Sequence, residues 1–224
     1  VGRHSLLANT TGGKNVAFGS GTLAGNTTAS NNTGLGWASL FTNTTGANNT
    51  AVGMSALLAN TTASNNTAVG YQAGLANTTG ANNTSIGYQS LLDNTTGFSL
   101  TSVGWGSLGN NTTGYENVAV GVSALRDNTT GLNNIAVGGS ALLSNTTQSG
   151  NTAIGYQALT TNTTASQLVA VGYQAGKTVS AGGGSCTFIG YQAGTLTTGS
   201  TNTAVGALAL TANTTATTNT VVGY

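Results

Sequence analysis

The stretch Asn66-Thr67-Ala68-Val69-Gly70-Tyr71-Gln72-Ala73 decides the fold, because close copies of it recur along the whole chain. Its central glycine returns every 17 residues through most of the chain, and the last three copies follow at steps of 18, 16 and 17. A period of this length is typical of an architecture in which each repeat stacks on its neighbours. These framing glycines are Gly2, Gly19, Gly36, Gly53, Gly70, Gly87, Gly104, Gly121, Gly138, Gly155, Gly172, Gly190, Gly206 and Gly223.

The three residues before each framing glycine alternate in size, as in Thr67, Ala68 and Val69. Alternation with a period of two predicts a short strand with one face toward a core. We expect Thr67 and Val69 to face the core and Ala68 to allow close approach on the other face. With the leucines of a second inward segment, the predicted core is Val52, Val69, Ile86, Val103, Val120, Val137, Ile154, Val171, Leu57, Leu91, Leu125 and Leu142.

Each repeat continues with a variable, often aromatic residue, a short apolar segment and the triplet Asn-Thr-Thr. Asn tolerates left-handed backbone conformations and bonds to its own backbone, so the triplet is typical of a turn. The apolar segment is too short for a helix between Gly and Asn. The sequence therefore predicts an all-β parallel β-solenoid, or β-roll, of about 13 stacked coils, each with two short strands.

The whole of 1–224 reads as a single repeat array, with an irregular repeat at about 176–190. Because the sequence begins and ends inside a repeat, we expect it to be a fragment of a longer fibre. The glycine-rich part of the irregular repeat, Ser180 to Ser185, lacks the Lys-Ser/Thr ending of a phosphate-binding loop. We interpret it as a loop variant of the repeat.

Charged residues make up 3% of the chain, against about 25% in ordinary soluble domains. Four cations and three acids give a net charge of +1 and no basic stripe, which argues against nucleic-acid binding. No run of about 18 apolar residues occurs, so we expect no membrane insertion. The lone Cys186 cannot form an intrachain disulfide, which leaves an inert small residue or an interchain bridge.

No set of residues for catalysis is visible in the sequence. His4 has no other histidine, cysteine or acidic cluster near it, and Asp93 and Asp127 occupy the same repeat position two repeats apart. No serine comes with a base and an orienting carboxylate. Calcium-binding repeats need an Asp in each repeat, and these have almost none. We expect no enzyme activity, no cofactor and no metal.

The Asn-Thr-Thr triplets are also formal glycosylation sequons, although turn chemistry alone accounts for them. Further sequons of the form Asn-Asn-Thr begin at Asn31, Asn48 and Asn65. Ice binding by the paired threonines is disfavoured, because adjacent residues such as Thr10 and Thr11 cannot point the same way from one strand. The candidate glycosylation sites are Asn9, Asn26, Asn43, Asn60, Asn77, Asn94, Asn111, Asn128, Asn145, Asn162 and Asn213.

The residue after each framing glycine is the candidate for surface contact, with a cell-surface glycan or another receptor as the partner. The candidate contact residues are Trp37, Tyr71, Tyr88, Trp105, Tyr156, Tyr173 and Tyr191.

The repeats at Asn66 to Ala73, Asn83 to Ser90 and Asn151 to Leu159 resemble the arrays of phage and bacterial tail-fibre-domain proteins. They are also similar to the head domains of trimeric autotransporter adhesins. The resemblance implies a left-handed parallel β-roll, three chains side by side, on the surface of a bacterium or virion. The adhesin heads have shorter coils, and a longer coil can enclose a core within a single chain.

We therefore expect a structural or adhesive extracellular fibre shaft that associates with copies of itself as a homotrimer. The alternative is a self-assembling, glycosylated extracellular filament built from stacked coils, since open solenoid ends carry unpaired strand edges.

Overall fold

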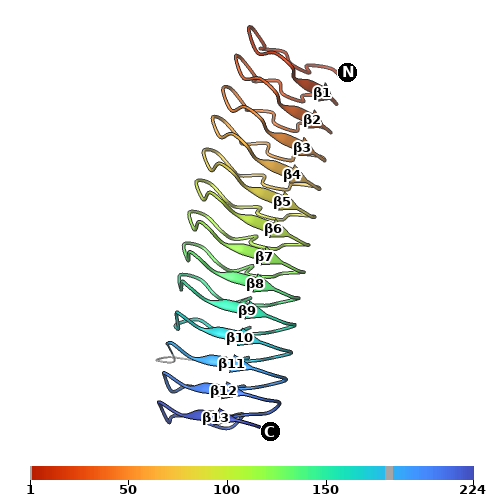
Figure 1. Ribbon diagram of the computed structural model, residues 1–224. Coiled ribbons are helices and arrows are strands. Elements are labelled where there is room, and N and C mark those ends of the chain that lie inside the picture. The colour runs from red at the N-terminus through yellow and green to blue at the C-terminus, as the bar shows by residue number, and fades with distance from the viewer. Residues whose placement is uncertain (1, 180–183) are drawn as a thin grey trace. The chain divides into compact units, whose positions relative to one another are not determined.

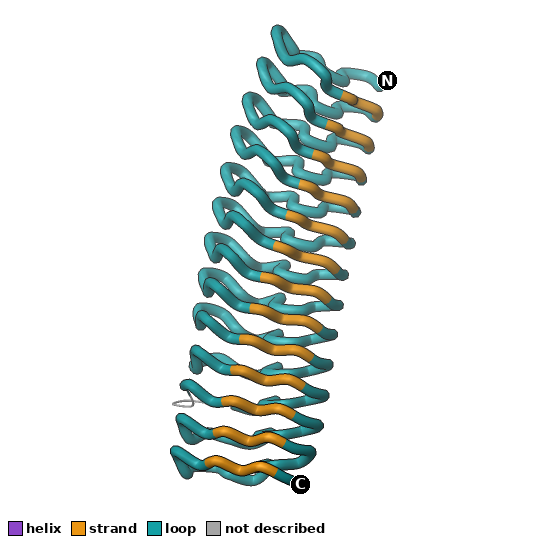
Figure 2. The backbone as a smooth tube through the Cα atoms, viewed as in Figure 1, coloured by secondary structure: helices purple, strands orange, loops and turns teal. Residues whose placement is uncertain are grey.

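The computed structural model describes residues 2–179 and 184–224, and within them every regular element is a strand of three residues. The chain divides into two compact units, Val1–Tyr115 and Glu116–Tyr224. Figures 1 and 2 show the short strands, one in each coil, joined by loops and turns. The prediction of an all-β parallel β-solenoid with 17-residue coils is confirmed. The first unit contains β1 (Val16–Phe18), β2 (Thr33–Leu35), β3 (Thr50–Val52), β4 (Thr67–Val69), β5 (Thr84–Ile86) and β6 (Thr101–Val103). The second contains β7 (Val118–Val120), β8 (Ile135–Val137), β9 (Thr152–Ile154), β10 (Val169–Val171), β11 (Thr187–Ile189), β12 (Thr203–Val205) and β13 (Thr220–Val222).

Within each unit, consecutive strands pair in parallel and in register. In β3 and β4, Ala51 pairs with Ala68 and Val52 with Val69, so each residue type lies beside its own copy. The longer step in the sequence leaves the register intact, because Val169 of β10 pairs with Thr187 of β11, 18 residues on. Residues 180–183 of the predicted irregular repeat lie outside the described residues.

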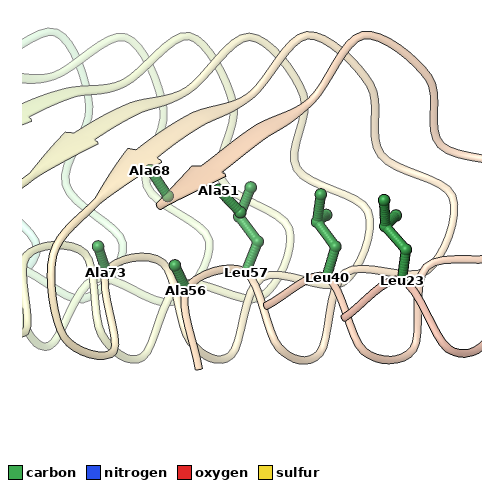
Figure 3. Packing of buried hydrophobic residues seen from close by; sticks show 7 residues of the cluster. All are labelled: Leu23, Leu40, Ala51, Ala56, Leu57, Ala68 and Ala73. Atoms are coloured by element: carbon green, nitrogen blue, oxygen red, sulfur yellow. The ribbon is translucent and has the colours of Figure 1, made fainter. Parts of the chain in front are cut away.

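The strands face the core with their small central residue, which reverses the predicted orientation. Ala68 is fully buried, Thr67 is half-buried and Val69 is 37% exposed. Figure 3 shows the reason: the alanines of the strands lie directly against leucines that rise from the opposite wall of the coil. The two walls leave room for a methyl group and a leucine, but not for two branched side chains. The eight predicted core residues Val52, Val69, Ile86, Val103, Val120, Val137, Ile154 and Val171 therefore point outward, and none of them is buried.

The leucines of the second segment are in the core, as predicted. Leu57, Leu91, Leu125 and Leu142 are all buried. Where glycine replaces this leucine, a neighbour fills the space. A Cβ on Gly74 would lie 3.1 Å from Leu57 Cδ2, and a Cβ on Gly176 would lie 2.8 Å from Phe188 Cδ2. A small residue on one wall is thus compensated by a large residue on the other: Phe188 occupies the usual alanine position of its strand, and Gly176 occupies the usual leucine position.

The second segment itself is not the strand that the sequence predicted. It runs through consecutive turns in which alternate residues take a left-handed backbone, with φ of 56° at Ser55 and 49° at Leu57. Such a φ costs a leucine of the order of 1 kcal/mol or more. The fold compensates by burying the side chain and by a hydrogen bond from Leu57 N to Ala73 O in the next coil, at 3.0 Å.

The framing glycine is required by the close approach of successive coils. Gly70 has φ of 139°, and a Cβ there would collide with the carbonyl group of Gly87. The same collision recurs along the column, so only glycine fits the corner.

Candidate functional site

The asparagines of the Asn-Thr-Thr triplets from Asn26 to Asn162 are buried and form a ladder. Asn60 Nδ2 donates to Asn43 Oδ1 at 2.8 Å and to Ala63 O at 3.0 Å. Asn60 Oδ1 in turn accepts from Asn77 Nδ2 at 2.9 Å. Because each amide donates to the previous coil and closes its own turn, the ladder ties coil to coil from the inside.

This ladder argues against a glycan at most of the predicted glycosylation sites in the folded chain. A glycan is attached through Nδ2, and in these residues that atom is buried and used in hydrogen bonds. The buried members are Asn26, Asn43, Asn60, Asn77, Asn94, Asn111, Asn128, Asn145 and Asn162, whereas Asn9 and Asn213 are half-exposed. The Asn-Asn-Thr sequons differ, since Asn31, Asn48 and Asn65 are exposed.

A second asparagine ladder, which the sequence interpretation missed, lies just before the strands. The backbone N–H of Asn66 donates to Asn49 Oδ1 at 2.9 Å, and Asn66 Nδ2 donates to Gly80 O at 3.0 Å. The sequence feature that could have predicted this ladder is the asparagine that recurs four residues before successive framing glycines. Cys186 takes this position in its coil, where Asn202 N donates to its Sγ at 3.3 Å.

Threonine completes the polar connections between coils. The first threonine of a triplet bonds to the next coil, as when Thr61 Oγ1 donates to Thr78 O at 3.1 Å. The second, such as Thr62, is exposed. The two threonines therefore differ in role, and the hydroxyl of the first is already engaged within the protein.

The seven predicted contact residues, Trp37, Tyr71, Tyr88, Trp105, Tyr156, Tyr173 and Tyr191, are all exposed. Several of them stack on one another from coil to coil. The rings of Tyr71 and Tyr88 have centroids 5.2 Å apart and planes 16° apart, and those of Tyr173 and Tyr191 are 5.4 Å and 9° apart. Stacked rings cover each other's faces, so the column presents mainly ring edges to solvent.

The outward aliphatic residues run beside this aromatic column and make an apolar strip. In the first unit Leu35, Val69 and Ile86 are exposed next to Trp37, Tyr71 and Tyr88 across the framing glycines. In the second unit Ile154 and Ile189 are exposed in the same way. A row of exposed apolar side chains that recurs from coil to coil is a candidate interaction site.

The titratable groups form no cluster around a site. Arg126 Nε pairs with Asp127 Oδ1 at 2.9 Å, and this hydrogen bond raises the pKa of Arg126. Cys186 is buried with a free thiol, and burial raises its pKa. Its burial removes the predicted alternative of an interchain disulfide in the folded chain. Among the described residues no group of three or more His, Cys, Asp or Glu could hold a metal ion.

In the described part of the chain no helix has the length and apolar character needed to cross a membrane. Comparison with known proteins gives no match to a family model, a curated protein or a solved structure.

Proposed function

We propose that this chain is the shaft of an extracellular structural fibre, in which copies associate side by side through the apolar strip. The observation that carries the proposal is the set of hydrogen-bonded columns that join neighbouring coils within each unit. Strand pairing, the two asparagine ladders and the threonine column all run in the stacking direction. A β-solenoid held together in this way is compatible with a structural, fibre-like role.

The side-by-side association is supported by the chemistry of the strip. Its members, among them Val69, Ile86 and Tyr88, are uncharged. A large apolar residue directly before the framing glycine recurs along the chain, whereas the aromatic residue after the glycine is present in only some coils. A second copy with the same repeat can meet this strip in register over many coils, which sums many weak contacts. Attachment to a virion or a cell surface, and adhesion through the strip, follow from the resemblance to tail-fibre and adhesin repeats.

The test is the mass of the chain in solution. The wild type should form a closed oligomer, and the triple variant Leu35→Thr, Val69→Thr, Ile86→Thr should shift toward monomer. Threonine suits a strand and replaces exposed apolar surface with a hydroxyl. The matched control is Thr62→Ala, Thr79→Ala, Thr96→Ala, which changes exposed threonines of the turns. A wild-type monomer at all concentrations, or an unaltered mass for the triple variant, would contradict side-by-side association.

The alternative function, a self-assembling filament, has a different signature in the same measurement. Stacking of coils end to end gives open-ended polymers whose mass grows with concentration, since unpaired strand edges invite further pairing. If such a filament is glycosylated, the reachable acceptors include the exposed Asn31, Asn48 and Asn65. Intact-mass analysis after expression in a glycosylating host would show hexose additions on peptides containing these residues.

A further inference from the structure

One coil of the first unit lacks the outward side chains that its neighbours carry. At positions one, two and five after the framing glycine this coil has Ser20, Gly21 and Ala24. The coil before it has His4 and Leu7 at positions two and five, and the coil after it has Trp37 and Phe41 at positions one and five. These eight residues, counting Ala38, line a hollow of about 360 Å³. This volume falls within the range of about 300 to 1,000 Å³ typical of small-molecule sites.

The hollow has the width of one missing layer of the stack. Gly21 N donates to Arg3 O at 2.8 Å and Ala38 N donates to Ser20 O at 2.9 Å, so the three coils are immediate neighbours. Two steps of about 4.8 Å set the backbones of the outer coils roughly 10 Å apart. A flat ring in van der Waals contact on both faces needs roughly 7 to 8 Å. The gap therefore suits a single planar ring.

The chain itself shows what occupies this position elsewhere. Tyr71 and Tyr88 place aromatic rings on successive coils with centroids 5.2 Å apart, and Tyr156 and Tyr173 do so at 5.6 Å. Next to Trp37, the coil of Ser20 supplies no such ring. Phe41 leans over the floor, because a Cβ on Gly21 would lie 3.2 Å from Phe41 Cδ2. A ligand ring in the hollow would meet Trp37 as one tyrosine of the column meets the next.

We propose that this hollow binds a small planar aromatic molecule with one polar substituent, of the phenol class. The lining is predominantly apolar. Besides the indole N–H of Trp37, its polar side-chain groups are the imidazole of His4 and the hydroxyl of Ser20. These two groups match one hydroxyl on a ring. A pyranose is less well matched, because its several hydroxyls would lose water and find few partners against Leu7, Trp37 and Phe41.

The experiment is a titration of the full chain with p-cresol, followed by the NMR signal of the Trp37 indole N–H. The chain has two tryptophans, so the variant Trp37→Phe assigns the signal. We expect saturable shifts in the wild type. Ser20→Tyr should weaken binding by about tenfold or more, since the new ring fills the gap from within. Val122→Tyr is the matched control, because it adds a ring at the same repeat position in the second unit and should leave binding unchanged.

A parallel titration with methyl glucoside tests the alternative that the hollow binds a sugar. Saturable binding of the glucoside without binding of p-cresol would overturn the proposal in favour of a sugar site. Absence of saturable binding by either compound would overturn it as well. Equal binding of p-cresol to the wild type and to Ser20→Tyr would also contradict it, because the compound would then occupy another part of the surface.

Discussion

At the scale of single residues, the inner asparagines contribute most to the connection between coils. A buried amide that both donates and accepts is costly to remove, because its former partners stay in the core without bonds. Asn60 is such a residue, because it donates to Asn43 in the preceding coil and accepts from Asn77 in the following coil. The sequence showed a turn at Asn-Thr-Thr, but its local pattern carried no information on which atoms of the triplet are buried.

Asn60→Ala should lower the free energy of unfolding by about 2 to 5 kcal/mol, since Asn43 Oδ1 and one N–H of Asn77 lose their partner. Thr62→Ala, two residues on at an exposed position, should change it by about 0.5 kcal/mol or less. Urea denaturation followed by circular dichroism measures both. Similar midpoints for the two variants would show that the ladder adds little stability.

The thiol of Cys186 makes the stability of the folded chain fall at alkaline pH. Burial raises the thiol pKa in the folded chain, while the unfolded chain loses this proton near about pH 8.5. Between the two pKa values the folded state binds more protons than the unfolded state, so stability falls as the pH rises. Thermal unfolding from pH 7 upward should show this decline in the wild type and a weaker decline in Cys186→Ala. Parallel curves for the two proteins would contradict the assignment.

At the scale of the element, each strand has one narrow inner position and two outer ones. The alternation of Thr67, Ala68 and Val69 correctly predicted a strand with two different faces. It did not identify the inner face, because hydrophobicity favours burying valine when the wall opposite is far away. Here Leu57 and its copies bring the walls so close that a small residue such as alanine fits opposite a leucine.

This orientation predicts opposite sensitivities for two apolar residues of neighbouring coils. Val69→Thr should cost less than about 1 kcal/mol, because the side chain already faces solvent. Leu57→Ala should cost about 2 to 5 kcal/mol, because it empties part of the core. Chemical denaturation measures the free energy of unfolding of both variants and of the wild type. A larger loss for Val69→Thr would restore the orientation expected from the sequence.

At the scale of the whole molecule, stability within each unit is distributed over coils that contact their neighbours. Such an array behaves in a nearly one-dimensional manner, so damage to one coil should spread to the adjacent coils first. The register of β2 to β5 repeats at the same 17-residue spacing, so no coil in this part of the first unit is set apart by its pairing.

Hydrogen exchange should therefore show slow amides in the strands of both units of the wild type. In Asn60→Ala the loss of protection should centre on residues 43–77, and β9 to β12 of the second unit serve as the internal reference. Fast exchange throughout the wild-type backbone would refute a folded solenoid. Uniform loss across the mutant would refute local coupling between neighbouring coils.

The sequence by itself determined the period, the parallel pairing, the absence of helix in the repeat and the exposure of the aromatic column. These features follow from the spacing of Gly70 and its copies, because a constant step places like residues side by side whatever the shape of the coil. Only the tertiary structure decided that Ala68 rather than Val69 faces inward, that Asn60 is a buried rung, and that Ser20 leaves a gap beside Trp37. Each of these depends on the distance between walls or between coils, which no local pattern encodes.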